Sequence, residues 1–483
     1  TKRAQPTADG APSPPPMCAS RRRAACCARL ELASVIPARH DPPQHDVSIM
    51  NAGANHSSPP LTARLLASRL PFHYGWVVLA CLCCVGFARQ GPAVATLSIF
   101  VEPLTREFGW SRTALSGAVS LGGLLAALVA PLLGPLLDRR GARLILCFAV
   151  TVNGAALLLL SLTPSLLVFY LLFSVARMNW AGPFDLGIFA TLNNWFIARR
   201  RSAASIVTLA HMAGLMAMPL IAQFAMSQSG WRGGWIALGA VTLTAGLIPV
   251  WLFLVRRPED LGLAPDRPLA AQPDAAVLAE TEPRFSRRQA IRTPAFWLLM
   301  LYTAAVYPVQ AGVSLHQAPH LLQRGLDPAT TALIVGSFSL MSGLATVACG
   351  VLPRTWPVRF PLALSAGLLV AGTLLMPAIA STFQGYVAVG LFGLGIGGAL
   401  TLTPIAWADY FGREHYGAIR GIALSTQVVA QAAGPLLSGA LYDLTGDYRL
   451  ALQVFAALSA LAIAAALAAK PPPNPFEARS ARL

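Results

Sequence analysis

The chain has 483 residues, of which 55% are hydrophobic and only 12% are charged, and its mean hydropathy is +0.58. Soluble globular domains carry about 25% charged residues, so this composition excludes an ordinary soluble enzyme and is typical of a protein that crosses a membrane several times. The formal net charge of +16 comes mostly from arginines in short loops between apolar runs, which argues against a nucleic-acid-binding surface.

The amino-terminal stretch differs from the rest of the chain. Residues 1–70 are rich in Pro, Ala, Ser and Arg and show no sustained periodicity, so we expect a disordered extension. The stretch RRRAACCARLELASV is interrupted by arginine and glutamate and does not predict a secretory signal. Because the chain begins at Thr1, Met50 is a candidate for the natural start.

Twelve apolar segments follow, each near the roughly 20 residues that a membrane-spanning helix needs. We expect them at about 74–100, 112–135, 143–163, 165–193, 203–227, 234–255, 295–318, 328–351, 361–380, 384–408, 417–440 and 449–469. The sequence therefore predicts an all-α membrane protein with one six-helix bundle over 71–255 and a second over 294–470. A polar central loop with five prolines (256–293) joins them, and a tail (471–483) ends the chain.

Arginines distinguish the two sides of this predicted membrane domain. With the amino terminus inside, the inner connections hold Arg139, Arg140, Arg143, Arg199, Arg200, Arg201, Arg256, Arg257, Arg354, Arg359 and Arg413. The outer connections hold Arg106, Arg112, Arg232, Arg324 and Arg449. Because arginine-rich loops stay on the cytoplasmic side, we expect both termini, the central loop and the tail to be cytoplasmic, in a bacterial-type inner (plasma) membrane.

The two halves of the chain contain related stretches. NWFIARRRSAAS before the fifth segment resembles DYFGREHYGAIRG before the eleventh, and GWR before the sixth resembles DYR before the twelfth, both at an offset of roughly 215 residues. A weak internal repeat in a six-plus-six layout is typical of a secondary transporter.

The stretch GPLLDRRGARL (134–144) connects the second and third segments through a tight turn. Gly141 supplies the backbone freedom that the turn needs, and Asp138 can face the positive end of a neighbouring helix and pair with an arginine. The stretch resembles a loop of the major facilitator superfamily that latches the two halves together on the cytoplasmic side. The residues that match are Gly134, Asp138, Arg139, Gly141 and Arg143. The alternative is a positively charged anchor without a mechanical role, and the copy at 350–360 lacks the aspartate.

Within that superfamily, several stretches are similar to the monocarboxylate-transporter and oxalate/formate-antiporter branch, over most of residues 72–470. They are FHYGWVVLACLCCVGF, IFVEPLTREFGWSRTALSGA, NWFIARRRSAASIVTLAHMAG, RRQAIRTPAFWLLM and AGPLLSGALYDLTGDYRLAL. The resemblance implies a carboxylate held by a basic residue in segment 8 or by lysines in segments 1 or 11. Here segment 8 is uncharged, the spans contain no lysine, and segment 11 has only Arg420 at its cytoplasmic end.

Instead, charges lie deep in the first and fourth segments. Arg89 is about 20 Å from the inner end of segment 1, and Arg177 is roughly 18 Å from the outer end of segment 4, so both lie near the middle of the bilayer. The resemblance implies that these two segments line the central cavity. Our hypothesis is that Arg89 and Arg177 bind an anion while Asp185 balances charge or exchanges a proton. The alternative is a structural Arg177–Asp185 ion pair.

Weaker candidates for contact with the solute are Tyr302, Tyr307 and Gln310 in segment 7 and Trp407 in segment 10, each of which could equally serve helix packing. No cofactor or metal is predicted, because the cysteines within the spans have no partners at metal-ligand spacing. The glycines of FGLGIGGAL are not followed by the Lys-Ser or Lys-Thr of a nucleotide-binding loop.

The predicted function is secondary transport of a small organic anion, a mono- or dicarboxylate, coupled to protons or to a counter-anion. We expect a monomer in the lipid bilayer, not an enzyme and not a partner of nucleic acid. One alternative is a proton-coupled drug or metabolite exporter of the same fold, with Asp185 as the site for a cation. An alternative of another class, a membrane sensor or an intramembrane enzyme, is disfavoured because Asp185 is the only acid deep within a span.

Overall fold

The computed structural model describes residues 60–266, 283–353 and 355–474, and every regular element in these ranges is a helix. Met50 and most of the predicted extension lie outside them. Residues 61–69 differ from the prediction of disorder, because they form helix α1 (Leu61–Arg69). Its Thr62 hydroxyl donates a hydrogen bond to the Leu252 carbonyl, and its Ala63 is fully buried. These tertiary contacts supply the stability that an isolated nine-residue helix lacks.

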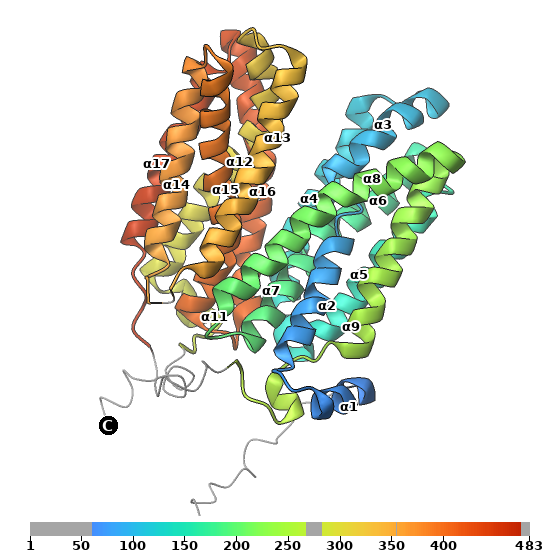
Figure 1. Ribbon diagram of the computed structural model, residues 1–483, viewed down its shortest axis with the longest axis vertical. Coiled ribbons are helices and arrows are strands. Elements are labelled where there is room, and N and C mark those ends of the chain that lie inside the picture. Colours follow the sequence, from blue (N-terminus) through green and yellow to red (C-terminus); the bar gives the residue numbers. More distant parts are fainter. Residues whose placement is uncertain (1–59, 267–282, 354, 475–483) are drawn as a thin grey trace, which may run out of the picture. The chain divides into compact units, whose positions relative to one another are not determined.

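The membrane domain follows α1 (Figure 1). The described elements in chain order are α2 (Gly75–Ala88), α3 (Val94–Phe108), α4 (Arg112–Arg140), α5 (Ala142–Leu160), α6 (Leu166–Ala181), α7 (Pro183–Trp195), α8 (Arg200–Val241), η2 (Thr242–Leu247), α9 (Ile248–Phe253), η3 (Pro258–Leu261), α11 (Arg287–Ile291), α12 (Pro294–Gln323), α13 (Pro328–Val351), α14 (Arg359–Leu375), η4 (Met376–Ala378), α15 (Thr382–Phe411), α16 (Tyr416–Thr445) and α17 (Arg449–Ala468).

Nine helical stretches of the described chain are long and apolar enough to cross a membrane. The three other predicted spans are also helical. The first is divided between α2 and α3, the sixth continues the fifth within one long helical stretch, and the eleventh is α16. The fifth and sixth spans meet at Ser229 and Gly230, whose φ/ψ values of −136°/17° and 68°/−175° lie outside the helical region. The predicted all-helical, multi-span fold is confirmed.

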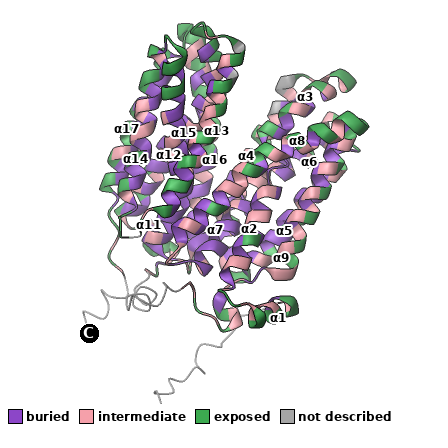
Figure 2. Cartoon of the chain, in the orientation of Figure 1, coloured by how far each residue is buried: buried purple, intermediate pink, exposed green. Residues whose placement is uncertain are grey.

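The helices pack as two bundles, an N-terminal bundle from α2 to α9 and a C-terminal bundle from α12 to α17 (Figure 1). Extensive contacts between the bundles join α4 to α16 and α8 to α13. Buried residues run through the interior of each bundle, and exposed residues lie along its outside (Figure 2). On α4, Leu124, Leu128 and Leu132 form an exposed stripe at helical spacing, 56%, 63% and 74% exposed. Such a stripe suits contact with lipid rather than water.

Local chemistry sets the ends of the spans close to the predicted positions. Ser111 and Thr293 cap α4 and α12 by accepting hydrogen bonds from backbone N–H groups in the first turn. Asp327 caps α13 in the same way and begins this helix at the residue that the sequence predicts. The α4–α5 turn has a left-handed residue, Gly141, at a φ of +84°, which glycine adopts without steric cost.

Candidate functional site

Two spans of the N-terminal bundle are interrupted partway along their length. The first breaks between α2 and α3 at Gly91-Pro92, and the fourth breaks between α6 and α7 at Gly182-Pro183. Proline disfavours the helical conformation of the residue before it, and glycine tolerates the irregular backbone that results. Each break therefore exposes helix ends inside the bundle, as in other transporters with discontinuous spans.

Opposite charges lie at these two breaks. Arg89 is the C-cap of α2, and Asp185 is in the first turn of α7. A cation at the carboxyl end of a helix and an anion at the amino end are each favoured by the helix dipole. The Nη1 atom of Arg89 lies 3.7 Å from Oδ1 of Asp185, so the breaks bring the two predicted residues together.

Arg420 of α16 also contacts Asp185, although the sequence placed it at the end of its span. Its Nη2 atom lies 3.6 Å from Oδ2 of Asp185, and the Arg420 side chain is 2% exposed. The same Nη2 donates a hydrogen bond of 2.6 Å to Oε1 of Gln427, seven residues further along the helix. Seven residues correspond to about 10 Å of helix. The Arg420 and Gln427 side chains therefore meet partway along this length, so the guanidinium of Arg420 lies deeper in the protein than its backbone.

Arg177 lies against an aromatic ring rather than against Asp185. Its guanidinium carbon is 3.8 Å from the centroid of Trp180, and that of Arg89 is 5.0 Å from the same ring. Trp180 is oriented by its Nε1–H, which donates a 2.9 Å hydrogen bond to Oε1 of Gln90. The alternative Arg177–Asp185 ion pair is therefore not formed, because Asp185 pairs with Arg89 and Arg420.

These residues form what we call the arginine cluster: Arg89, Arg177, Arg420 and Asp185. Its three guanidinium groups and one carboxylate together carry a net charge of +2. Within the described residues, the Nε and Nη1 atoms of all three arginines are buried without a hydrogen-bond acceptor. A buried unpaired donor costs about 1–3 kcal/mol, so the cluster favours an additional anionic acceptor. The Asp185 side chain keeps 15% of its surface exposed, so water reaches the cluster.

The weaker predicted site residues are distributed over the C-terminal bundle. Tyr307 is buried within electrostatic range of Arg420 and Asp185, so it adjoins the cluster. Tyr302 instead donates a hydrogen bond to the Leu362 carbonyl, and it packs inside the bundle. Gln310 accepts a hydrogen bond from the Gln431 side chain, and Trp407 is buried against Phe296 and Phe411. In this structure Tyr302, Gln310 and Trp407 therefore contact other residues of the C-terminal bundle.

The bundles also meet at the side that holds the arginine-rich connections (the arginine-rich side). Asp138 at the end of α4 accepts hydrogen bonds from the backbone N–H groups of Gly417 and Ala418, at 2.9 and 2.8 Å. The carboxylate thus faces the positive end of α16, as the sequence predicted. Gly134 lies one turn earlier, where a Cβ atom would stand 2.1 Å from the Gly417 carbonyl oxygen. Only glycine allows the two helices to approach this closely.

The other residues of the predicted loop act within the N-terminal bundle. Arg143 donates a hydrogen bond to the Trp251 carbonyl, and Arg139 is exposed. Arg256 reaches the turn as well, and it donates to the backbone carbonyl of Asp138 rather than to its carboxylate. Burial lowers the pKa of Arg256 from its ordinary value, and the guanidinium packs over Gly141. The predicted arginine partner for the Asp138 carboxylate is therefore replaced by the helix amides.

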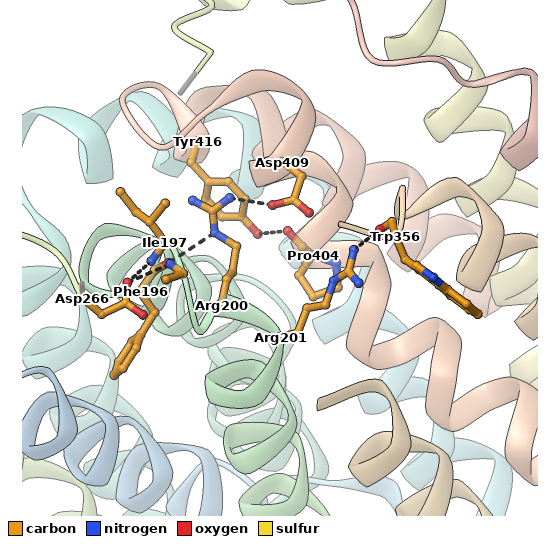
Figure 3. Close-up of polar contacts among 10 residues, drawn as sticks. Phe196, Ile197, Arg200, Arg201, Asp266, Trp356, Pro404, Asp409 and Tyr416 are labelled. Carbon is orange, nitrogen blue, oxygen red and sulfur yellow. Dashed lines mark hydrogen bonds and ion pairs between the residues drawn. The ribbon is translucent and has the colours of Figure 1, made fainter. Parts of the chain in front are cut away.

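A second contact between the bundles uses side-chain donors at the carboxyl end of a helix, rather than a side-chain acceptor at an amino end. Arg201 at the start of α8 donates hydrogen bonds to the carbonyl oxygens of Pro353 and Trp356, just after α13. Figure 3 shows the bond to Trp356. The hydroxyl of Ser202 donates to the Gly350 carbonyl at 2.6 Å. The related stretch at 350–360, which lacks the aspartate, therefore also contributes to the contact between the bundles, because α8 supplies hydrogen-bond donors to the carboxyl end of α13.

The repeated stretches that precede α8 and α16 contact each other. Arg200 forms a 2.7 Å ion pair with Asp409 of α15 (Figure 3), and Arg413 donates to the carbonyl of Asn194. Asn194 and Asp409 are equivalent positions of the internal repeat. The repeat that the sequence showed is thus a pseudo-symmetric contact between the bundles.

Asp266 of the central loop braces the same region. Its carboxylate accepts hydrogen bonds from the backbone N–H groups of Ile197, Ala198 and Arg199, immediately before α8 (Figure 3). A cavity of about 330 Å³ lies beside it, lined by His73, Trp76, Phe196, Arg199 and residues 262–266. The lining belongs to the N-terminal bundle and the central loop, away from the arginine cluster.

A known protein family matches most of this chain. The model of the Major Facilitator Superfamily matches residues 78–384 and 311–482. The chain belongs to the Major Facilitator Superfamily. It is therefore a multi-pass membrane transporter and not an enzyme.

Relatives within the superfamily cover most of the chain. Monocarboxylate transporter 11 of Mus musculus is 29% identical over 391 residues, which cover 78% of this chain and 83% of the relative. The uncharacterized MFS-type transporter YcxA of Bacillus subtilis is 23% identical over 384 residues, covering 76% and 89%. Two solved structures have the same fold. They are the proton:xylose symporter XylE (TM-score 0.63, 13% identity, 81% of this chain and 94% of that chain) and FucP in the outward conformation (TM-score 0.62, 12% identity, 83% and 100%).

This superfamily member contains functional candidates that sequence reasoning missed. Arg420 was discounted because its backbone lies near the end of a span. The two Gly-Pro pairs that break the first and fourth spans were a usable signal, since both follow a charged or polar stretch in the middle of an apolar segment. Arg201 and Asp266 had no such signal, because each bonds to backbone groups that are distant in sequence.

Proposed function

We propose that this transporter carries a small organic anion, a mono- or dicarboxylate, through the centre of the molecule. The observation that supports this proposal is the arginine cluster, in which a single carboxylate accompanies three buried arginines whose Nε and Nη1 atoms have no hydrogen-bond acceptor among the described residues. Guanidinium groups bind carboxylates through paired N–H donors, and Arg177 and Arg89 are already oriented by the Trp180 ring. The names of the relatives, monocarboxylate transporters, agree with a carboxylate cargo.

The proposed mechanism is alternating access between the two bundles. The hydrogen bonds of Asp138, Arg201 and Arg200 hold the bundles together at the arginine-rich side, which we assign to the cytoplasm together with both termini. These contacts must break before the cluster opens to that side. Transport of the anion would be coupled either to a proton that Asp185 takes up or to a counter-anion that the same arginines bind.

A cation exporter is the second candidate, and the cluster disfavours it. Asp185 is the acid that would bind a cation, but Arg89 and Arg420 already face both of its oxygens. The net charge of the cluster is positive, so a second cation would be repelled. An anionic carboxylate would instead be attracted by this positive charge.

Uptake of labelled organic acids into proteoliposomes under an imposed pH gradient tests the proposal. Wild type should accumulate at least one mono- or dicarboxylate, and Arg89→Gln and Arg177→Gln should each reduce uptake at least tenfold. Arg106→Gln is the matched control, since this arginine is exposed and pairs only with Glu102 among the contacts described. Normal rates and affinities in both cluster variants, or uptake of a lipophilic cation instead, would refute an anion site here.

A further inference from the structure

Asp185 and Arg420 form a charge contact between the two bundles. Asp185 belongs to α7 of the N-terminal bundle, and Arg420 belongs to α16 of the C-terminal bundle. The distances from the Asp185 oxygens to Arg89 and Arg420, 3.7 and 3.6 Å, exceed those of a direct charge-assisted hydrogen bond, about 2.7–2.9 Å. Moreover, Oδ2 of Asp185 has no hydrogen-bond donor among the residues described. Asp185 thus offsets part of the positive charge but leaves N–H donors of both arginines available for another acceptor.

The three arginines belong to two positions, one in each bundle. Arg89 and Arg177 share the Trp180 ring and therefore form one position in the N-terminal bundle. Arg420 forms the other position in the C-terminal bundle, where Gln427 holds its Nη2. Each position presents buried N–H groups that have no acceptor in the described part of the chain, and the three positive charges exceed the single negative charge of Asp185 by two.

We infer that the solute is a dianion whose two carboxylates bind the Arg89–Arg177 position and Arg420 at the same time. This inference rests on the proposed function and narrows its substrate class. A monoanion would engage the arginines of one bundle and leave one positive charge uncompensated. A trianion would bring its third carboxylate against Asp185, which has the same charge. The charge of the cluster, rather than the size of the solute, then determines selectivity.

Charge matching makes a stepwise prediction. Removing the positive charge of Arg420 leaves a net charge of +1, so the preference should move to monoanions. Removing the negative charge of Asp185 leaves +3, so the preference should move toward trianions. A binding site that recognised one carboxylate by hydrogen bonds alone would lose affinity in both variants without any change in preference.

The experiment measures binding of butyrate, glutarate and propane-1,2,3-tricarboxylate to the purified full-length protein by calorimetry at pH 7. These probes have similar carbon chains and carry one, two and three carboxylates. Wild type should bind glutarate at least tenfold more tightly than butyrate or the tricarboxylate. Arg420→Gln should bind butyrate at least as tightly as glutarate, and Asp185→Asn should narrow or reverse the gap between glutarate and the tricarboxylate. Arg449→Gln and Asp443→Asn, at exposed positions, should keep the wild-type order.

The wild-type order decides the inference even where a variant fails to fold, and Arg420→Lys, which keeps the charge, should retain the preference for glutarate. If butyrate binds as tightly as glutarate, or if Arg420→Gln keeps the wild-type order, the solute is not selected as a dianion, and the inference is wrong. Anion transport that depends on Arg89 would still stand in that case. If none of the three anions binds and none is transported, the proposed function fails as well.

Discussion

Gly134 allows the tightest contact between the two bundles, and Gly134→Ala should open the arginine-rich side. A Cβ atom there would lie 2.1 Å from the Gly417 carbonyl oxygen and 2.9 Å from the Cα of Ala418, which are backbone atoms that cannot rotate away. Real Cβ contacts are not shorter than 3.0 Å, so α4 and α16 must separate by roughly 1 Å or more. The bonds from Gly417 and Ala418 to Asp138 would then lengthen beyond the roughly 3.2 Å limit of a good hydrogen bond.

The free energy by which Gly134→Ala destabilises the closed arrangement follows from these two hydrogen bonds. Bonds to a charged group contribute about 1.5–3 kcal/mol each, but the separated amides and carboxylate regain water, so a net loss of about 2–3 kcal/mol is reasonable. This loss corresponds to a shift of roughly 30- to 150-fold in the ratio of the closed to the open arrangement of the bundles.

Alkylation of a reporter cysteine measures this shift. Leu137 is 3% exposed and lies at the same contact, so Leu137→Cys in a background without the eight native cysteines reports on opening. Adding Gly134→Ala should raise the alkylation rate by a factor in the range above. Gly439→Ala is the matched control on α16, because a Cβ atom there meets nothing within 4 Å. Equal alkylation rates in the two alanine variants, with equal thermal stability, would refute the role assigned to Gly134.

Two further predictions concern helix ends. Arg201→Gln should weaken the α8–α13 contact, because it removes donors to the Pro353 and Trp356 carbonyls, and a cysteine reporter on α13 should then be alkylated faster than in Arg140→Gln, an exposed control. Hydrogen bonds from Thr330 hold the pKa of Asp327 below its usual value, so this cap stabilises α13 above about pH 4 and loses its effect as the pH falls further. The melting-temperature difference between wild type and Asp327→Asn should therefore shrink between pH 6 and pH 3, and a constant difference would contradict this account.

Hydropathy and charge were sufficient to predict the spans, because lipid imposes length and composition on every crossing helix. They were not sufficient to predict the partners of Asp185. The prediction treats Arg177 and Asp185 as residues of one straight helix, but the break at Gly182 separates α6 from α7, so their spacing along the chain no longer sets their contact. For Arg420, the prediction takes depth from the backbone, whereas the long side chain extends toward Gln427 and brings its charge to Asp185.

The same features explain why charges persist in spans that lipid would otherwise keep apolar. A buried charge is tolerated where a partner, a helix dipole or water offsets its desolvation. Arg89 and Asp185 obtain helix dipoles because Gly91-Pro92 and Gly182-Pro183 create helix ends within the bundle. Arg420 joins them from the other bundle, so the electrostatic balance of the cluster depends on how closely α7 and α16 approach. A solute that changes this balance therefore acts directly on the contact that must alter when the bundles rearrange.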